Sequence, residues 1–172
     1  MAKQAKNIRY FAWATAWGPM GAAASDKGLV RVVLPHYQLD QLEQLLTWDF
    51  QGAVKDEAPF TRLVELSRAY FNGVATDFSE LACDGGVAFA GEVYRVCRTI
   101  PYGQTTSYHM LAEMMHRPDA ARAVAAALGK NPTPLVVPCH RVTYADGRCG
   151  GFSAPGGEAL KMRMLELEKK AK

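Results

Sequence analysis

The residues of this sequence best suited to chemistry are a cysteine and a histidine that follow one another in Pro138-Cys139-His140-Arg141-Val142. A cysteine attacks as its thiolate, and a free cysteine with a pKa near ~8.5 is mostly protonated at neutral pH, so it needs a base such as His140. Because neighbouring side chains of an extended strand point to opposite faces, the two can cooperate only if the backbone turns or a water molecule links them. Pro138, at the end of the apolar and strand-like run Leu135-Val136-Val137, favours such a turn.

The last predicted helix supplies a carboxylate for the same site. Residues 157–170 carry an apolar stripe made of Leu160, Met164 and Leu167. Glu168, four residues after Met164, leans toward that stripe. A carboxylate on an apolar face needs a partner, which His140 would provide. We therefore expect a relay of Cys139, His140 and Glu168, with water as the link between the first two.

Two helical segments precede the cysteine, and the break between them is short. The first is predicted from about Thr106 to His116, and Arg117-Pro118 interrupts it. The second is predicted to run from Pro118 to about Leu128, because proline suits the first turn of a helix. This arrangement resembles a helix-turn-helix.

The second of these helices is rich in alanine, with six alanines between Asp119 and Leu128. Val124 and Leu128 should pack inward, which leaves Arg122, Ala126 and either Ala123 or Lys130 outside. A face of methyl groups reads base edges poorly in a major groove, but it is thin enough to enter a minor groove, where Arg122 could reach into the base stack. An ordinary alanine-rich helix with one solvated arginine fits the same residues.

Two further segments flank the pentapeptide around Cys139 in the sequence. Asn131-Pro132 precedes it and Gly150-Gly151-Phe152-Ser153 follows it. Together these segments resemble the active-site signature of the O6-alkylguanine-DNA alkyltransferases, also called methylated-DNA-protein-cysteine methyltransferases. The likeness is closest from about Phe89 to Glu168, and a weaker one covers Trp17-Gly18-Pro19-Met20-Gly21 and Gly28-Leu29-Val30.

The resemblance implies a role for each of several residues. The reacting group would be Cys139, His140, Glu168 and Asn131, with Asn131 tying the helix-turn-helix to the active-site strand. The substrate pocket would be formed by Tyr108, Arg122, Val142, Ser153, Phe152 and Gly150. The DNA-binding surface would be formed by Thr105, Thr106, Ala120, Ala121, Arg122, Ala123, Ala126 and Ala127.

By the same resemblance, the protein would flip an O6-alkylguanine, and also an O4-alkylthymine, out of double-stranded DNA bound through the minor groove. It would transfer the alkyl group irreversibly to Cys139, once per molecule and without a cofactor. Tyr108 would interact with a guanine ring nitrogen and Ser153 would lie near O6, while Arg122 would fill the space left by the extruded nucleotide. The backbone around Cys139 and Val142 would read the exocyclic amine.

Simpler roles remain open for these residues. Tyr108 could be a core tyrosine, Ser153 a turn residue and Asn131 a helix cap. Phe152 stands where many relatives have tyrosine, so the pocket lacks that hydroxyl. Two other functions also remain: a lesion-binding module of the alkyltransferase-like kind, which lacks the cysteine, and a cysteine hydrolase that turns over many substrates.

The elements expected around this site give an α+β fold. In the amino-terminal part, β-like residues 10–15, a turn at Gly18-Pro19 and the run 29–34 predict an antiparallel meander, and helices are predicted at 39–49 and 59–71. Residues 72–87 lose periodicity. We expect a scaffold domain at 1–85 and a DNA-binding, alkyl-accepting domain at 86–172, which the resemblance would make ribonuclease H-like and winged-helix-like.

Charge and composition limit the partners. Residues 1–85 hold 8 Lys and Arg against 10 Asp and Glu, a net of −2, while the remainder holds 12 against 7, a net of +5. This asymmetry suits a polyanionic partner for the second part, although a solvated surface could show it by chance. We expect a monomer that can bind DNA together with further copies. Its expected location is the cytoplasm, or the nucleus of a nucleated cell.

Several classes of protein are not expected. No window approaches the ~18 apolar residues of a membrane-spanning helix, and no export signal is present. The four cysteines have no CxxC spacing, and only His36 and Cys83 could bind zinc before residue 90, so neither a disulfide framework nor a metal site is predicted. The glycine-rich loop from Gly147 to Gly157 lacks the Gly-Lys-Ser/Thr of a P-loop.

Overall fold

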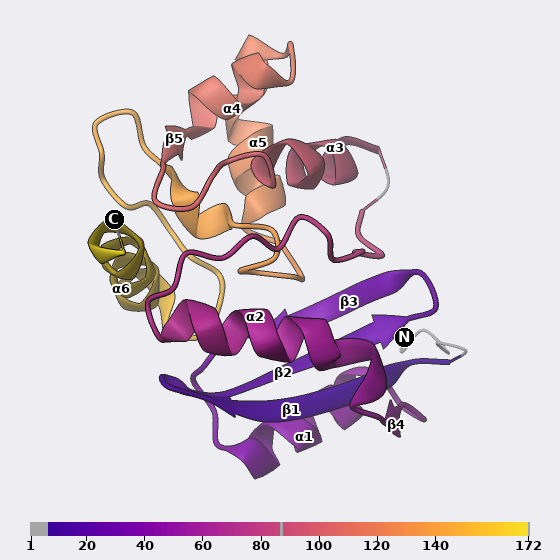
Figure 1. Cartoon of the computed structure of the whole chain (residues 1–172). Coiled ribbons are helices and arrows are strands. Elements are labelled where there is room, and N and C mark those ends of the chain that lie inside the picture. The colour runs from indigo at the N-terminus through magenta and orange to yellow at the C-terminus, as the bar shows by residue number, and fades with distance from the viewer. Residues whose placement is uncertain (1–6, 87, 172) are drawn as a thin grey trace. The chain divides into compact units, whose positions relative to one another are not determined.

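A computed structural model describes residues 7–86 and 88–171 of the chain (Figure 1). The chain divides into two compact units, Met1–Asp84 and Gly85–Lys172. The first combines a small sheet with helices, and the second is mostly helical. The predicted α+β class is therefore confirmed. Within the described residues, no helix has both the length and the apolar character needed to cross a membrane.

The sheet of the first unit has the strand order β3-β2-β1-β4. Its strands are β1 (Arg9–Thr15), β2 (Gly18–Ser25), β3 (Gly28–Val33) and β4 (Val54–Lys55). The predicted antiparallel meander is formed by β1, β2 and β3. The turn between β1 and β2 lies at residues 16–17, so the prediction of a turn at Gly18-Pro19 was wrong, and Pro19 instead pairs with Ala14. The two residues of β4, which pair in parallel with β1, were too few to show a pattern.

Helices cover both faces of this sheet. Helix α1 (Leu39–Asp49) packs with Tyr10 and Ala12 of β1 in one apolar cluster. Helix α2 (Thr61–Phe71), which follows a 3-10 turn at Ala58–Phe60, receives the hydrogen bond that Trp13 Nε1 donates to Ser67 Oγ over 2.9 Å. Because Ala12 and Trp13 are neighbours in a strand and point to opposite faces, the two helices lie on opposite sides of the sheet (Figure 1).

The second unit is built from four helices and a pair of very short parallel strands. The helices are α3 (Ala88–Cys97), α4 (Tyr108–Met114), α5 (Ala121–Leu128) and α6 (Gly157–Lys170). The strands are β5 (Thr106–Ser107) and β6 (Val142–Thr143), and 3-10 turns lie at Pro118–Ala120 and Cys139–Arg141. Val93, Leu111, Val124 and Leu128 form much of the core where α3, α4 and α5 meet. As predicted, the second helix of the helix-turn-helix points Val124 and Leu128 inward.

Three details of this unit differ from the prediction. Helix α4 starts at Tyr108 and not at Thr106, because Ser107 caps it by accepting a hydrogen bond from the Met110 backbone N–H at 3.1 Å. The apolar run 135–137 is not a strand: Leu135, at φ 75°, and Val136 form a turn, and Val137 makes only an isolated bridge with Pro134. In α6, Leu167 is only half-buried and Lys161 takes a place in the buried stripe. A short apolar run reports burial but cannot by itself distinguish a strand from a turn.

The core of the second unit gives a direct stability test. Leu111 of α4 is fully buried, while its neighbour Met110 is 55% exposed. We expect Leu111→Ala to lower the free energy of unfolding of this unit by about 2–5 kcal/mol, because the truncation leaves a cavity. Met110→Ala should change it by less than about 0.5 kcal/mol. Urea unfolding of both variants measures the difference, and equal effects would contradict this packing.

Candidate active site

The backbone turns at Cys139, as Pro138 predicted. Pro138 has φ −79° and ψ 61° and leads into the 3-10 turn Cys139–Arg141, in which the Arg141 N–H donates to the Pro138 carbonyl over 2.9 Å. Cys139, His140 and Arg141 are all buried. A 3-10 turn directs successive side chains about 120° apart, so the three groups of this tripeptide reach three different neighbours.

Asn131 holds the thiol of Cys139. Its Nδ2 lies 3.2 Å from Cys139 Sγ and also donates to the Val137 carbonyl over 2.9 Å, while its Oδ1 accepts from the Thr133 N–H over 3.0 Å. These bonds fix which end of the amide faces the sulfur. Burial raises the pKa of the Cys139 thiol, and the Asn131 hydrogen bond and the charge of Lys161 oppose that rise. The predicted neighbourhood of Asn131 and Cys139 is present in the structure.

His140 and Glu168 form a buried pair. His140 Nε2 lies 2.7 Å from Glu168 Oε1, and both side chains are shielded from solvent. Burial lowers the pKa of His140 against the pull of Glu168, so the imidazole is neutral at pH 7. With Nε2 donating its proton to the carboxylate, Nδ1 is the nitrogen that can accept one.

Arg141 is the second partner of Glu168, and the sequence had offered it no role. Its Nε and Nη2 lie 3.0 Å and 3.1 Å from the carboxylate oxygens, and its Nη1 donates to the Ile100 carbonyl over 2.7 Å. The Gly103 N–H adds a further bond to Glu168 Oε2 over 2.9 Å. Burial favours a protonated Glu168, but its bonds to His140 and Arg141 outweigh burial and lower its pKa to about 2. The sequence feature that could have pointed to Arg141 is the Glu168 carboxylate, since one histidine satisfies only part of the hydrogen-bonding capacity of a carboxylate.

The two short strands connect the thiol to helix α4. Strand β6 follows the Cys139 turn directly, and β5 ends where α4 begins. Thr106 pairs with Val142 and Ser107 with Thr143. These two residue pairs therefore place Tyr108, the first residue of α4, near the Cys139 turn. The sequence had assigned Tyr108 and Cys139 to the same site.

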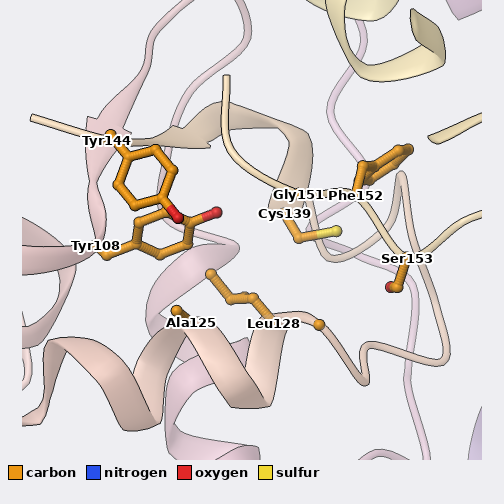
Figure 2. A pocket seen from close by; sticks show the side chains of 9 residues that line it. Tyr108, Ala125, Leu128, Cys139, Tyr144, Gly151, Phe152 and Ser153 are labelled. Atoms are coloured by element: carbon orange, nitrogen blue, oxygen red, sulfur yellow. The ribbon is translucent and has the colours of Figure 1, made fainter. Parts of the chain in front are cut away.

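A cavity of about 350 Å³ opens beside Cys139 (Figure 2). Its lining comprises Tyr108, Ala125, Leu128, Gly129, Cys139, Tyr144, Gly151, Phe152 and Ser153. Figure 2 shows the Tyr108 and Tyr144 rings on one side of Cys139 and Phe152 and Ser153 on the other. The predicted pocket residues Tyr108, Phe152 and Ser153 thus lie around one space with the thiol. Tyr144 had not been predicted, because nothing in its local sequence separates it from a surface tyrosine.

Gly150 lies against the tyrosine wall of this cavity. It has φ 70°, and a Cβ at this position would lie 2.9 Å from the Tyr108 hydroxyl and 3.2 Å from the Tyr144 ring. Only glycine fits this conformation and this approach. Burial and the neighbouring Tyr144 raise the pKa of Tyr108 to about 12, so its hydroxyl stays protonated and can donate a hydrogen bond.

The other predicted residues are distributed between surface and core. On α5, Arg122, Ala123 and Ala126 are exposed, as the helical pattern predicted, and the neighbouring Ala120, Ala121 and Thr106 are partly exposed, while Thr105 is exposed. Ala127, which the resemblance assigned to the DNA-binding surface, is buried in the core, and its carbonyl accepts a hydrogen bond from the Tyr94 hydroxyl over 2.9 Å. Val142 is also buried, with its carbonyl accepting from Lys161 Nζ over 2.7 Å.

A helix-turn-helix beside a buried thiol at the wall of a cavity is the arrangement expected of a DNA-binding protein with a reactive cysteine. Comparison with known proteins agrees. Residues 88–170 match the family described as "6-O-methylguanine DNA methyltransferase, DNA binding domain". The methylated-DNA-protein-cysteine methyltransferase of Shigella flexneri is 36% identical over 159 residues, which cover 90% of this chain and 92% of that protein. The one of Mycobacterium tuberculosis is 42% identical over 114 residues, covering 66% and 68%.

A solved structure is similar over almost the whole chain. The crystal structure of Mycobacterium tuberculosis OGT in complex with DNA has a TM-score of 0.77 and 34% sequence identity, and the match covers 95% of this chain and 94% of that one. The chain belongs to the methylated-DNA-protein-cysteine methyltransferase family.

The low pKa of Glu168 gives a test by acid. Because this pKa lies at about 2 and its ordinary value is 4.5, ionised Glu168 stabilises the fold above about pH 4.5, and the contribution is lost as the pH falls toward 2. The difference corresponds to about 3 kcal/mol. Glu168→Gln should be less stable by about this amount at pH 7 and should lose less stability on acidification than the wild type.

Urea unfolding at several pH values measures this difference. Glu166→Gln is the matched control, since Glu166 is exposed on the same helix. An acid dependence that is identical in Glu168→Gln and the wild type would show that Glu168 does not hold a charge in the folded protein.

Proposed function

We propose that Cys139 is the residue that accepts the alkyl group in this protein. The chain is a DNA repair protein that directly reverses O6-alkylguanine damage, as a methylated-DNA-[protein]-cysteine S-methyltransferase. The observation that supports Cys139 as the acceptor is its position: Sγ is held by Asn131 at the wall of a cavity of about 350 Å³. A cavity of this size suits a small-molecule group such as an extruded base.

The reaction we propose is a displacement at a saturated carbon. The Cys139 sulfur forms a bond to the alkyl carbon while the bond from that carbon to guanine O6 breaks, and the electron pair of that bond stays with guanine. The thiol proton passes through a water molecule to His140 Nδ1, because Nε2 is already engaged by Glu168. Glu168 stays ionised and stabilises the imidazolium. The product is a thioether, which has no easy route back to a thiol, so each molecule reacts once.

The cavity lining suggests how the leaving base is stabilised. The Tyr108 hydroxyl is a protonated donor and would act on a ring nitrogen, and Ser153, across the cavity, would act near O6. Phe152 would pack against the base without the hydroxyl of a tyrosine. Gly150 would leave the tyrosine wall unobstructed. The second lone pair of the Val142 carbonyl remains able to accept the exocyclic amine beside its bond from Lys161.

The DNA side of the proposal rests on α5. Its outward face offers Arg122 among the small side chains of Ala123 and Ala126, and such a face can enter the minor groove of double-stranded DNA. Arg122 would occupy the space of the flipped nucleotide. All the proposed site residues belong to the carboxy-terminal unit of one chain, so the protein can act as a monomer, and the amino-terminal unit serves as a scaffold. Several molecules bound side by side would give sigmoidal binding curves on long DNA.

Intact-protein mass tests the acceptor. After incubation with an excess of duplex carrying O6-methylguanine, the wild type should gain about 14 Da, the mass of one added methylene, and never a second increment. Peptide mapping should place it on Cys139, and Cys139→Ala should gain nothing, with Cys149→Ala as the matched control that still reacts. Methyl groups on another cysteine would refute this assignment. Repair by unmodified protein would indicate a hydrolase, and bound but unrepaired lesion a binding module.

A second test separates base flipping from chemistry. Arg122→Ala should slow methyl transfer from duplex DNA by about tenfold or more, since unstacking costs a few kcal/mol that the wedge no longer offsets. Its reaction with the free base O6-benzylguanine should be unchanged, because that substrate needs no extrusion. Lys169→Ala, an exposed cation on α6, is the control for lost charge. An equal loss with both substrates would mean that Arg122 acts elsewhere.

A further inference from the structure

Lys161 is the least expected residue near the active site. It lies in the buried stripe of α6 with 1% of its surface exposed. Its Nζ donates to the Val142 carbonyl over 2.7 Å and lies 6.0 Å from the centre of the Tyr108 ring. Val142 follows the Cys139 turn, and Tyr108 lines the cavity, so the ammonium is held between two parts of the site. A buried ammonium is costly unless an opposite charge compensates it.

No carboxylate forms an ion pair with this ammonium in the part of the chain that the structure describes. Glu168, the other charged residue buried on α6, is engaged by His140 and Arg141, and no ion pair there includes Lys161. The groups that favour a charged Lys161 are three thiols and one carboxylate: Cys149, Cys139, Glu158 and Cys97. Glu158 is exposed at the start of α6, and Cys149 is only partly buried. Among the thiols, Cys139 alone combines burial with a hydrogen-bond donor aimed at its sulfur.

We propose that Lys161 is the buried counter-cation of the Cys139 thiolate, a positioning residue that stabilises the nucleophile through space and not by moving its proton. The inference rests on Cys139 being the acceptor. In this arrangement His140 removes the proton, and Lys161 lowers the cost of the negative charge that remains in the apolar interior. The charge of Arg141 is already compensated by Glu168, so Lys161 is the cation left for the sulfur.

Other groups also face Cys139, and their effects on its ionisation must be distinguished from the effect of Lys161. They are Asn131, His140 of the same turn, Tyr94 and Cys97 of α3, and Tyr108 of α4. Tyr94, Cys97 and Tyr108 all have raised pKa values through burial, so they are neutral at pH 7 and contribute no charge to the sulfur. A change in the ionisation of Cys139 after substitution of Lys161 alone can therefore be assigned to the ammonium.

The test uses two uncharged variants that differ in hydrogen bonding. Lys161→Gln can still donate to the Val142 carbonyl, and Lys161→Met cannot, while Lys161→Arg keeps the charge. The readout is the rate at which iodoacetamide modifies Cys139, followed by peptide mass at a series of pH values, with Cys97 and Cys149 quantified in the same digests. Lys170→Gln, exposed on the same helix, is the control. Circular dichroism verifies that each variant is folded at the assay temperature.

For both Lys161→Gln and Lys161→Met we expect the pH midpoint of Cys139 modification to rise by about one unit, which makes the reaction at neutral pH about tenfold slower. The rates should converge with the wild type at high pH, where the thiol is ionised in every variant. Lys161→Arg should keep the midpoint within a few tenths of a unit, and Lys170→Gln should not move it.

Three results would overturn the proposal. A wild-type midpoint in Lys161→Gln would assign the residue to the Val142 hydrogen bond, and an equal slowing at every pH would assign it to packing. A midpoint that moves only at Cys149 would make that thiol its partner. If Lys161→Met does not fold, the Gln and Arg variants still decide. Because the assay contains no DNA, its failure is distinguishable from a failure of Cys139 to accept a methyl group.

Discussion

The carboxylate of Glu168 is the group on which the rest of the site depends. It comes from α6 and receives hydrogen bonds from the His140 ring, the Arg141 guanidinium and the Gly103 backbone N–H. Two segments that are distant from α6 in the sequence, the Cys139 turn and the residues around Gly103, are thereby fixed to one buried anion. Without that anion, the Arg141 charge would be uncompensated in the interior, and the imidazole would have no fixed orientation. The carboxylate is thus structural and chemical at once.

The thiol of Cys139, the proposed acceptor, faces two opposing requirements. It must be buried, so that the base enters a dry cavity, yet burial disfavours the thiolate that reacts. The fold places three groups near the sulfur that can offset this cost: the amide of Asn131, the neutral imidazole of His140 and the ammonium of Lys161. The glycine-rich segment contributes Gly151, Phe152 and Ser153 to the lining of the cavity.

Much of this arrangement could be predicted from sequence, for identifiable reasons. Helices α1 and α6 have the predicted bounds because their apolar residues recur at helical spacing. Glu168 was found because a carboxylate on an apolar stripe needs a partner. The two-residue strands β4, β5 and β6 were not found, since two residues cannot display a period of two. Their positions depend on contacts with distant segments.

The misses within the site have the same origin. Lys161 was not predicted to be buried, although it lies three residues before Met164 and seven before Glu168, on the helix face that the structure buries. Arg141 and Tyr144 act on groups from other elements, and their immediate neighbours in the sequence carry no trace of this. The run 135–137 was wrongly predicted as a strand, because burial makes the turn at 135–136 as apolar as a strand.

The pair Asn131-Pro132 has a consequence for the chemical lifetime of the site. An asparagine deamidates to aspartate when the backbone nitrogen of the following residue attacks its side-chain amide. Proline has no backbone N–H with which to make this attack. Deamidation of Asn131 would put a negative charge 3.2 Å from the Cys139 sulfur, in place of the amide donor, and would disfavour the thiolate. The proline blocks that route. A molecule that acts only once can therefore wait for its lesion without losing the amide that keeps it ready.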